Sequence, residues 1–343
     1  MEQPRLRNKK ILVIGAGAVG SVTASLLKLN GYDVTIVTKY PDVAEKVSTT
    51  GFQLTGYRGS HTVLVPAISN TDQCQETADY ICVATKANDM LEAIANMIPK
   101  LKPDGRIISM QNGIVEETLA SIVGDKRVVG CVVGWGATMH ERGVVEMTSG
   151  GEFVIGYLKQ AADEQLRDLA EILGAIVPVE ISDNILSNLY SKLIINSCVT
   201  TLGAISGQYL GTMLKSRTAR KIFIRIIREA MAVARSMQLE VKPYANKLDY
   251  YSFLRGSELK RHLIIRVFGM KYKKLKSSSL QSLERGKPTE INYFNGYIAR
   301  KGKEHRTDAP MNQLLTNIVR EIEEGKRKIS PENFRDPEIL KLL

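Results

Sequence analysis

The sequence predicts an α/β protein of two domains: a mostly parallel sheet with helices over residues 1–181, then an all-α domain over residues 182–343. The chain has 343 residues, more than twice the ~150 residues of a typical domain. In the first half, continuous apolar runs typical of buried parallel strands alternate with helical segments. From about Ser182 the strand pattern stops and long helical periods replace it.

The first predicted unit is a strand, a helix and a second strand. Residues 11–14 form a continuous, β-branched apolar run after Lys10, which is typical of a buried parallel strand. A helical segment follows over residues 21–29 and ends at Asn30–Gly31, as a helix C-cap does. Residues 33–38 predict the second strand of this βαβ unit.

The turn between this strand and this helix carries the motif GAGAVG. Gly15 permits a tight turn, Gly17 lets the backbone approach a pyrophosphate, and Gly20 lets the helix pack closely on the strand. Free N–H groups at the helix N-terminus favour phosphate. Because strand and helix flank the motif in the required order, we predict a Rossmann-type dinucleotide site made by Gly15, Ala16, Gly17, Ala18, Val19 and Gly20.

The residues after the second strand bear on the choice between NAD and NADP. NAD-binding versions of this fold carry an acid there, ~20 residues past the first glycine, to bond the ribose 2′-hydroxyl. This chain has Lys39 at that place. Because a lysine attracts a 2′-phosphate, we predict NADP(H) as the cofactor. Two alternatives stay open: Lys39 is an ordinary exposed lysine, and Asp42 is near enough to permit NAD.

Two polar residues follow the next predicted strands. Lys86 comes after the strand over residues 78–85, and Asn112 comes after the strand over residues 105–110. Ligands of open α/β sheets bind at the carboxyl ends of strands. We therefore predict that both residues contact ribose, nicotinamide or a substrate carboxylate. Taken alone, Asn112–Gly113 fits a simple turn equally well.

A polar stripe marks the first helix of the second half, over residues 185–198. Asn188, Lys192 and Asn196 follow i, i+4, i+8 spacing and therefore share one face. A lysine in an apolar segment is costly to bury unless it is paired. The pattern indicates either a catalytic or substrate-binding lysine or a lysine that extends to the surface.

The rest of the second half is predicted to be helical as well. Three serines from Ser277 predict a helix start or an anion-binding turn. Glu290 is predicted to open another helix, with Thr289 as its cap. Residues 330–343 are predicted to be a tail.

Composition and charge restrict the partners and cofactors that the sequence predicts. Lys and Arg number 47 against 36 Asp and Glu, a formal net charge of +11, which a solvated basic surface and an anionic cofactor and substrate can explain. No nucleic-acid-binding signature accompanies this charge, and no apolar run approaches the ~20 residues of a membrane span. The four cysteines form no CxxC pair and the four histidines no ligand pair. We expect no metal site, no nucleic-acid or membrane partner, and a reducing cytoplasmic location.

Several motifs in the same order along the chain resemble the ketopantoate reductase (2-dehydropantoate 2-reductase) family. They are GAGAVG (15–20), VATKAND (83–89), QNG (111–113), SKLIINSCVTTLGAISG (191–207), SSSLQSLERGKPTEINYFNGYI (277–298) and APMNQLL (309–315). The resemblance implies a Rossmann domain followed by a helical domain related to that of 6-phosphogluconate dehydrogenase, with the active site in the cleft between them. It also implies NADPH-dependent reduction of ketopantoate to pantoate, a step of pantothenate and coenzyme A biosynthesis.

The resemblance assigns roles by position. It implies that Lys192 is the general acid and that Glu290 orients it. It implies substrate contacts for Asn196 and Ser278, a place beside the nicotinamide for Lys86 and Asn112, and a 2′-phosphate contact for Lys39.

Two departures from the family pattern concern the substrate. Thr200 stands where the family often has a second asparagine, and we expect Thr200 to contact substrate in its place. Ser282 stands where an acid is usual. The alternatives are therefore another 2-keto acid, an opine-type dehydrogenase reaction, or a dinucleotide-binding regulator without turnover. The pair Lys192 and Glu290 argues against the regulator, since a sensor needs no proton donor. A homodimer is compatible with the sequence.

Overall fold

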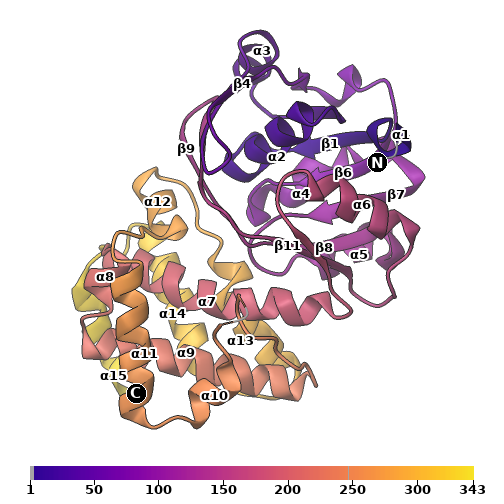
Figure 1. The fold of residues 1–343 in the computed structure, drawn as a ribbon. Coiled ribbons are helices and arrows are strands. Elements are labelled where there is room, and N and C mark those ends of the chain that lie inside the picture. Colours follow the sequence, from indigo (N-terminus) through magenta and orange to yellow (C-terminus); the bar gives the residue numbers. More distant parts are fainter. Residues whose placement is uncertain (1–3, 246) are drawn as a thin grey trace. The chain divides into compact units, whose positions relative to one another are not determined.

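The computed structural model describes residues 4–245 and 247–343. The chain separates into two compact units, one up to Leu186 and one from Ser187 to Leu343. The boundary lies near the start of helix α7 (Ile185–Ser206), a few residues after the predicted boundary at 181/182. Figure 1 shows strands and helices in the first unit and helices in the second.

The first unit is built on an eight-stranded sheet in the order β12-β11-β8-β7-β6-β1-β2-β5. β11 runs antiparallel to β8, and the other neighbours are parallel. This confirms the predicted mostly parallel sheet. The strands are β1 (Lys10–Ile14), β2 (Asp33–Val37), β5 (Ala67–Ile68), β6 (Ala78–Val83), β7 (Leu101–Ser109), β8 (Val128–Val133), β11 (Phe153–Tyr157) and β12 (Val179–Ile181).

Helices join these strands, as βαβ connections require. The helices of this unit are α1 (Pro4–Arg7), α2 (Ala18–Leu29), α3 (Pro41–Thr49), α4 (Met90–Ala95), α5 (Glu116–Val123) and α6 (Glu164–Gly174). Short 3₁₀ turns lie at Thr71–Gln73, Ala87–Asp89, Ile98–Lys100 and Asp125–Arg127.

A second, four-stranded sheet packs on α2 in the order β4-β3-β10-β9. Its strands are β3 (Phe52–Gly56), β4 (His61–Val63), β9 (Gly136–Glu141) and β10 (Val144–Ser149). Val22 and Leu26 of α2 share one buried core with Val145 and Met147 of β10. The turn between β9 and β10 contacts α3, where Lys46 Nζ donates to the carbonyl of Arg142 at 2.8 Å.

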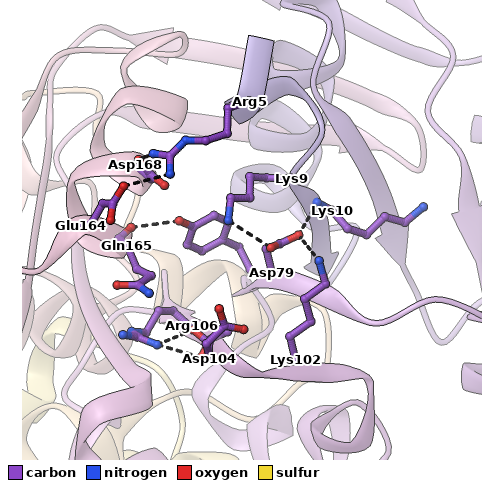
Figure 2. A network of polar contacts seen from close by, with 12 residues as sticks. Arg5, Lys9, Lys10, Asp79, Lys102, Asp104, Arg106, Glu164, Gln165 and Asp168 are labelled. Atoms are coloured by element: carbon purple, nitrogen blue, oxygen red, sulfur yellow. Dashed lines mark hydrogen bonds and ion pairs between the residues drawn. The ribbon is translucent and has the colours of Figure 1, made fainter. Parts of the chain in front are cut away.

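An ionic network closes the amino edge of the large sheet (Figure 2). Asp79 of β6 accepts the backbone N–H of Lys10 at 2.9 Å, Lys102 Nζ at 2.9 Å and Lys9 Nζ at 3.3 Å. Partial burial of Asp79 acts to raise its pKa, but these hydrogen bonds and lysine charges outweigh it, so the pKa of Asp79 lies below its usual value. The network ties together the starts of β1, β6 and β7.

The second unit is helical throughout its described part, apart from an isolated β-bridge between Tyr244 and Leu248. Its helices after α7 are α8 (Leu210–Met213), α9 (Arg217–Ser236), α10 (Tyr250–Arg255), α11 (Glu258–Lys271), α12 (Ser278–Glu284), α13 (Asn295–Glu304), α14 (Pro310–Glu323) and α15 (Pro337–Lys341), with 3₁₀ turns at Ile291–Tyr293 and Pro331–Arg335. This confirms the predicted all-α domain. In the described parts of both units, no helix combines the length and apolar character needed to cross a bilayer.

The C-terminal segment is folded, so the prediction of a tail over 330–343 is wrong. Phe334 and Ile339 are buried. Asn333 Nδ2 donates to the carbonyl of Ile205 in α7 at 3.0 Å, and Arg327 pairs with Asp336 at 2.8 Å. A few apolar side chains, ion pairs and hydrogen bonds to Ile205 hold the segment, and these are too sparse to produce a helical period in the sequence.

Candidate functional site

The glycine turn at the end of β1 is held by its neighbouring strands. The N–H of Gly15 donates to Val37 of β2 at 2.8 Å, and the N–H of Ala84 donates to Ile14 at 2.8 Å. Gly15 has φ +107°, and a Cβ there would lie 2.9 Å from the Thr85 nitrogen. A Cβ on Gly20 would lie 2.0 Å from the Gly15 oxygen. Both positions therefore require glycine for the chain's own packing.

Gly17 differs from these two glycines. It is exposed, its φ of −82° suits any residue, and the nearest atom to an added Cβ is the Ala84 oxygen at 4.0 Å. Gly17 caps α2, whose first turn has no acidic residue. A glycine that the chain's own packing does not need, at a helix N-terminus, suits the close approach of an anionic group from outside. These residues fit the pyrophosphate of a dinucleotide.

The tip of β2 carries charged residues from three segments. Lys39 is exposed, and its Nζ lies 3.9 Å from Asp89 Oδ2. Tyr40 caps α3, and the guanidinium of Arg142 lies 4.2 Å from the centre of the Tyr40 ring. Arg142 Nη1 also pairs with Asp42 Oδ2 at 2.6 Å. Arg142 was not predicted as a site residue, because it stands about a hundred positions along the chain from Asp42.

The carboxyl ends of β6 and β7 bring Lys86 and Asn112 into one neighbourhood. Both are half-buried. Gln111 links their strands: its Nε2 lies 3.4 Å from Thr85 Oγ1 and 3.5 Å from the Lys86 carbonyl. No role is predicted for Gln111 from the sequence, although a buried amide directly after an apolar strand is a signal that can indicate one. The conformation at residues 111–113 is a bend, with Gly113 at φ +90°.

A buried acid lies beneath this bend. Glu116, in the first turn of α5, is fully buried, and its Oε2 accepts the N–H of Val115 at 2.9 Å. Its Oε1 has no hydrogen-bond partner among the described residues. Burial raises the pKa of Glu116 to about 7, although backbone N–H groups and the Ser109 side chain act against this.

The polar stripe lies on α7, which is longer than the predicted segment and runs from Ile185 to Ser206. Asn188, Lys192 and Asn196 are half-buried, whereas Leu189 and Leu193 are buried. The stripe therefore forms the partly accessible line of a helix that is otherwise packed into the second unit. A lysine at such a position can reach a small molecule while its methylene groups stay packed.

The start of α12 packs on the later turns of α7. Ser277 Oγ caps α12 by accepting the N–H of Leu280 at 3.1 Å, and donates to the carbonyl of Thr200 at 3.2 Å. A Cβ on Gly203 would lie 2.5 Å from Ser277 Oγ, so glycine allows this approach. Ser278, the next residue, is exposed. Thr200 is buried, and its hydroxyl donates to the carbonyl of Asn196 at 2.7 Å.

Glu290 occupies a different local structure from the predicted one. It is buried and caps a 3₁₀ turn over Ile291–Tyr293, and α13 begins only at Asn295. The expectation that Glu290 opens a helix is therefore wrong by one turn, because Phe294 interrupts the helical backbone with φ −110° and ψ −102°. Thr289 Oγ1 does accept a backbone N–H, that of Ile291, at 3.2 Å. Asn295 accepts the hydroxyl of Thr201 and so joins this region to α7.

A metal site requires His, Cys, Asp or Glu side chains in a close arrangement. The described residues contain no group of three or more His, Cys, Asp or Glu side chains placed to hold a metal ion. The four cysteines, Cys74, Cys82, Cys131 and Cys198, are free thiols and buried.

Family models match both units. The model described as "Ketopantoate reductase PanE/ApbA" matches residues 11–160, and that described as "Ketopantoate reductase PanE/ApbA C terminal" matches residues 184–323. A 2-dehydropantoate 2-reductase of Pyrococcus abyssi is 28% identical over 323 residues, covering 93% of this chain and 100% of the relative. One from Archaeoglobus fulgidus is 28% identical over 322 residues, with 93% and 100% covered.

Solved structures agree with the fold. A PanE/ApbA family ketopantoate reductase from Ralstonia eutropha has a TM-score of 0.80 at 29% identity, with 93% of this chain and 100% of that chain covered. A D-mandelate dehydrogenase solved with NADH and anilino(oxo)acetate has a TM-score of 0.80 at 23% identity, with 92% and 99% covered, a likeness of fold alone. The two family matches, which together span most of the chain, show that it belongs to the ketopantoate reductase family, oxidoreductases that act on a CH–OH group.

Proposed function

We propose that this chain reduces a 2-keto acid to the corresponding 2-hydroxy acid with NADPH, and that ketopantoate is the substrate and pantoate the product. The observation that carries the proposal is the partly accessible Lys192 on α7, in a chain whose first unit holds the glycine turn of a dinucleotide site. The relatives named 2-dehydropantoate 2-reductase support this choice of substrate.

The dinucleotide, when bound, supplies a hydride. The backbone of residues 15–20 and the N-terminus of α2 hold its pyrophosphate, and Lys39 attracts the 2′-phosphate. Lys86 and Asn112, placed at the strand ends, border the nicotinamide.

The second unit supplies the proton in this proposal. As the carbonyl carbon of the keto acid gains the hydride, negative charge develops on the carbonyl oxygen. The Lys192 ammonium donates its proton to that oxygen, which completes the hydroxyl group of the product. Glu290 favours the charged form of this lysine, and Asn196, Thr200 and Ser278 bind the remaining polar groups of the substrate.

A second candidate function is the reduction of another 2-keto acid by the same site residues. Thr200 and Ser282 occupy positions where the family often has an asparagine and an acid, so the groups that recognise the far end of the substrate differ. Their hydroxyls both bond carbonyls of their own helices, Thr200 to Asn196 and Ser282 to Ser278 at 3.0 Å. An opine-type reaction, in which an amine joins the keto acid before reduction, belongs to the same class of alternatives.

A substrate panel tests the proposal. The purified chain is incubated with NADPH and, separately, with ketopantoate, a linear 2-keto acid, an aromatic 2-keto acid, and a 2-keto acid together with an amino acid, and NADPH absorbance is followed. We expect the highest kcat/KM with ketopantoate. A higher kcat/KM with another 2-keto acid would make that acid the substrate in place of ketopantoate. A rate that depends on the amino acid would indicate the opine reaction. Tight NADPH binding without turnover on any member would favour a regulator.

A further inference from the structure

We infer that Arg142 is a second cationic contact for the 2′-phosphate and that Lys39, Tyr40 and Arg142, here called the β2-tip cluster, select NADPH over NADH. The inference rests on the proposed function, because it requires that the first unit binds a nicotinamide dinucleotide. It adds to the site Arg142, a residue of the small sheet, and names the side chains that distinguish NADPH from NADH.

The cluster has a defined geometry around the Tyr40 ring. The Arg142 guanidinium lies 4.2 Å from the ring centre and the Lys39 ammonium 5.8 Å from it. Both cations are therefore near the tip of β2, where the adenosine ribose lies in this class of fold. A guanidinium over an aromatic ring is a favourable contact.

Arg142 is held in place by its own backbone. It occupies the turn between β9 and β10, and its carbonyl accepts Lys46 Nζ at 2.8 Å. The neighbouring Gly143 packs on the Lys46 side chain, where an added Cβ would lie 3.2 Å from Cε. The small sheet thus presents Arg142 to α3 as a fixed element, which lowers the entropic cost of using it in binding.

The pairing of Arg142 with Asp42 bears on the alternative, NAD as the cofactor, that the sequence left open. Asp42 is the acid near the tip of β2 that could bond a ribose 2′-hydroxyl and repel a 2′-phosphate. Its Oδ2 accepts Arg142 Nη1 at 2.6 Å, so its charge is balanced. A guanidinium has five N–H donors, and those not used by Asp42 can bind a phosphate in the planar geometry that it favours.

The charges around the β2-tip cluster bear on the difference between NADPH and NADH. Each cation of the cluster has one acidic neighbour within 4.0 Å among the described residues, Asp89 for Lys39 and Asp42 for Arg142. Lys39 Nζ is 3.9 Å from Asp89, a distance beyond a direct hydrogen bond, so a phosphate can compete for this lysine. A 2′-phosphate adds negative charge that the 2′-hydroxyl of NADH lacks, and only NADPH gains from these cations.

The test compares dinucleotide affinities of variants. Dissociation constants for NADPH and for NADH are measured by fluorescence titration of the full chain, wild type and Arg142→Ala. The matched control is Arg58→Ala, an exposed arginine in the β3–β4 turn of the same small sheet, which bonds the Ala175 carbonyl at 3.2 Å. The side chain of Arg142 is 54% exposed, and an exposed ion pair adds little stability, so the variant should fold.

We expect Arg142→Ala to weaken NADPH binding about 10-fold or more, the effect of losing a charge-assisted hydrogen bond, and to leave NADH within about 2-fold. Arg142→Lys should restore part of the loss, and Arg58→Ala should change neither affinity. An equal change for both dinucleotides, or none, would overturn the role of Arg142, and so would a wild-type preference for NADH. A wild-type chain that binds neither dinucleotide would overturn the proposed function itself, which separates the two failures.

Discussion

Two acids at opposite edges of the large sheet have pKa values shifted in opposite directions. At the amino edge, Asp79 meets two lysine ammonium groups and a backbone N–H, and its pKa falls. Beneath the carboxyl edge, Glu116 is fully buried with one oxygen unpartnered among the described residues, and its pKa rises to about 7. At the amino edge, the hydrogen bonds and lysine charges around Asp79 thus stabilise the fold. Beneath the carboxyl edge, which carries the candidate site, the burial of Glu116 costs folding free energy.

The same contrast applies to lysines. Lys9 and Lys102 bond Asp79 and hold strands together, whereas Lys39 sits on the exposed tip of β2 and Lys192 on the partly accessible face of α7. A lysine at the amino edge should therefore matter for folding, and one in the candidate site for turnover or binding. Four predictions test this division.

The largest expected effect is on catalysis. Lys192→Ala should lower kcat by about 10²- to 10⁴-fold, because a general acid contributes that much, while the midpoint of urea unfolding changes little. Lys221→Ala, a half-buried lysine on α9, is the control and should keep normal kcat. A near-normal rate in the Lys192 variant would remove this residue from the mechanism.

The next effect concerns Glu116. Its pKa is raised from 4.5 to about 7, so its contribution to stability is complete below about pH 4.5 and is lost as pH rises through about 7. Glu116→Gln keeps the shape of the side chain and cannot ionise. Urea unfolding across this pH range should show a difference between variant and wild type that grows to about 3 kcal/mol in favour of the variant. Parallel pH profiles would show that Glu116 does not titrate in this way.

Asp79 should show the opposite pH dependence. Its lowered pKa means that its contribution is present above its unfolded pKa, about 4, and is lost as pH falls through the lower folded value. Asp79→Asn should reduce the free energy of unfolding by about 2 kcal/mol at neutral pH, because charge-assisted hydrogen bonds are lost, and by less in acid. The NADPH dissociation constant should stay unchanged.

The control for this variant is Asp125→Asn, which removes a more exposed pair with Lys159 and should cost under about 1 kcal/mol. If Asp79→Asn instead weakened cofactor binding as much as stability, the two edges of the sheet would not be functionally separate.

The smallest expected effect is at Gly17. Gly17→Ala has room within the chain, since the nearest atom lies 4.0 Å from the new Cβ, so the free energy of unfolding should fall by no more than about 1 kcal/mol, the cost of alanine at a helix N-cap. The methyl group would meet the pyrophosphate, and NADPH affinity should fall about 10-fold, or about 1.4 kcal/mol. Gly174→Ala, on α6 with nothing within 4 Å, is the matched control. Unchanged affinity in the Gly17 variant would place the pyrophosphate elsewhere.

The sequence by itself determined the parts that depend on neighbouring residues. The βαβ unit, the glycine turn and the shared face of Asn188, Lys192 and Asn196 follow from backbone sterics and helical periodicity, which act over a few residues. Only the tertiary structure decided the rest: the contact of Arg142 with Tyr40 and Asp42, the link from Gln111 to Lys86, and the packing of residues 330–343. These contacts join segments far apart in the chain, and no local period encodes them. Their geometry is fixed by which surfaces pack together once the elements have formed.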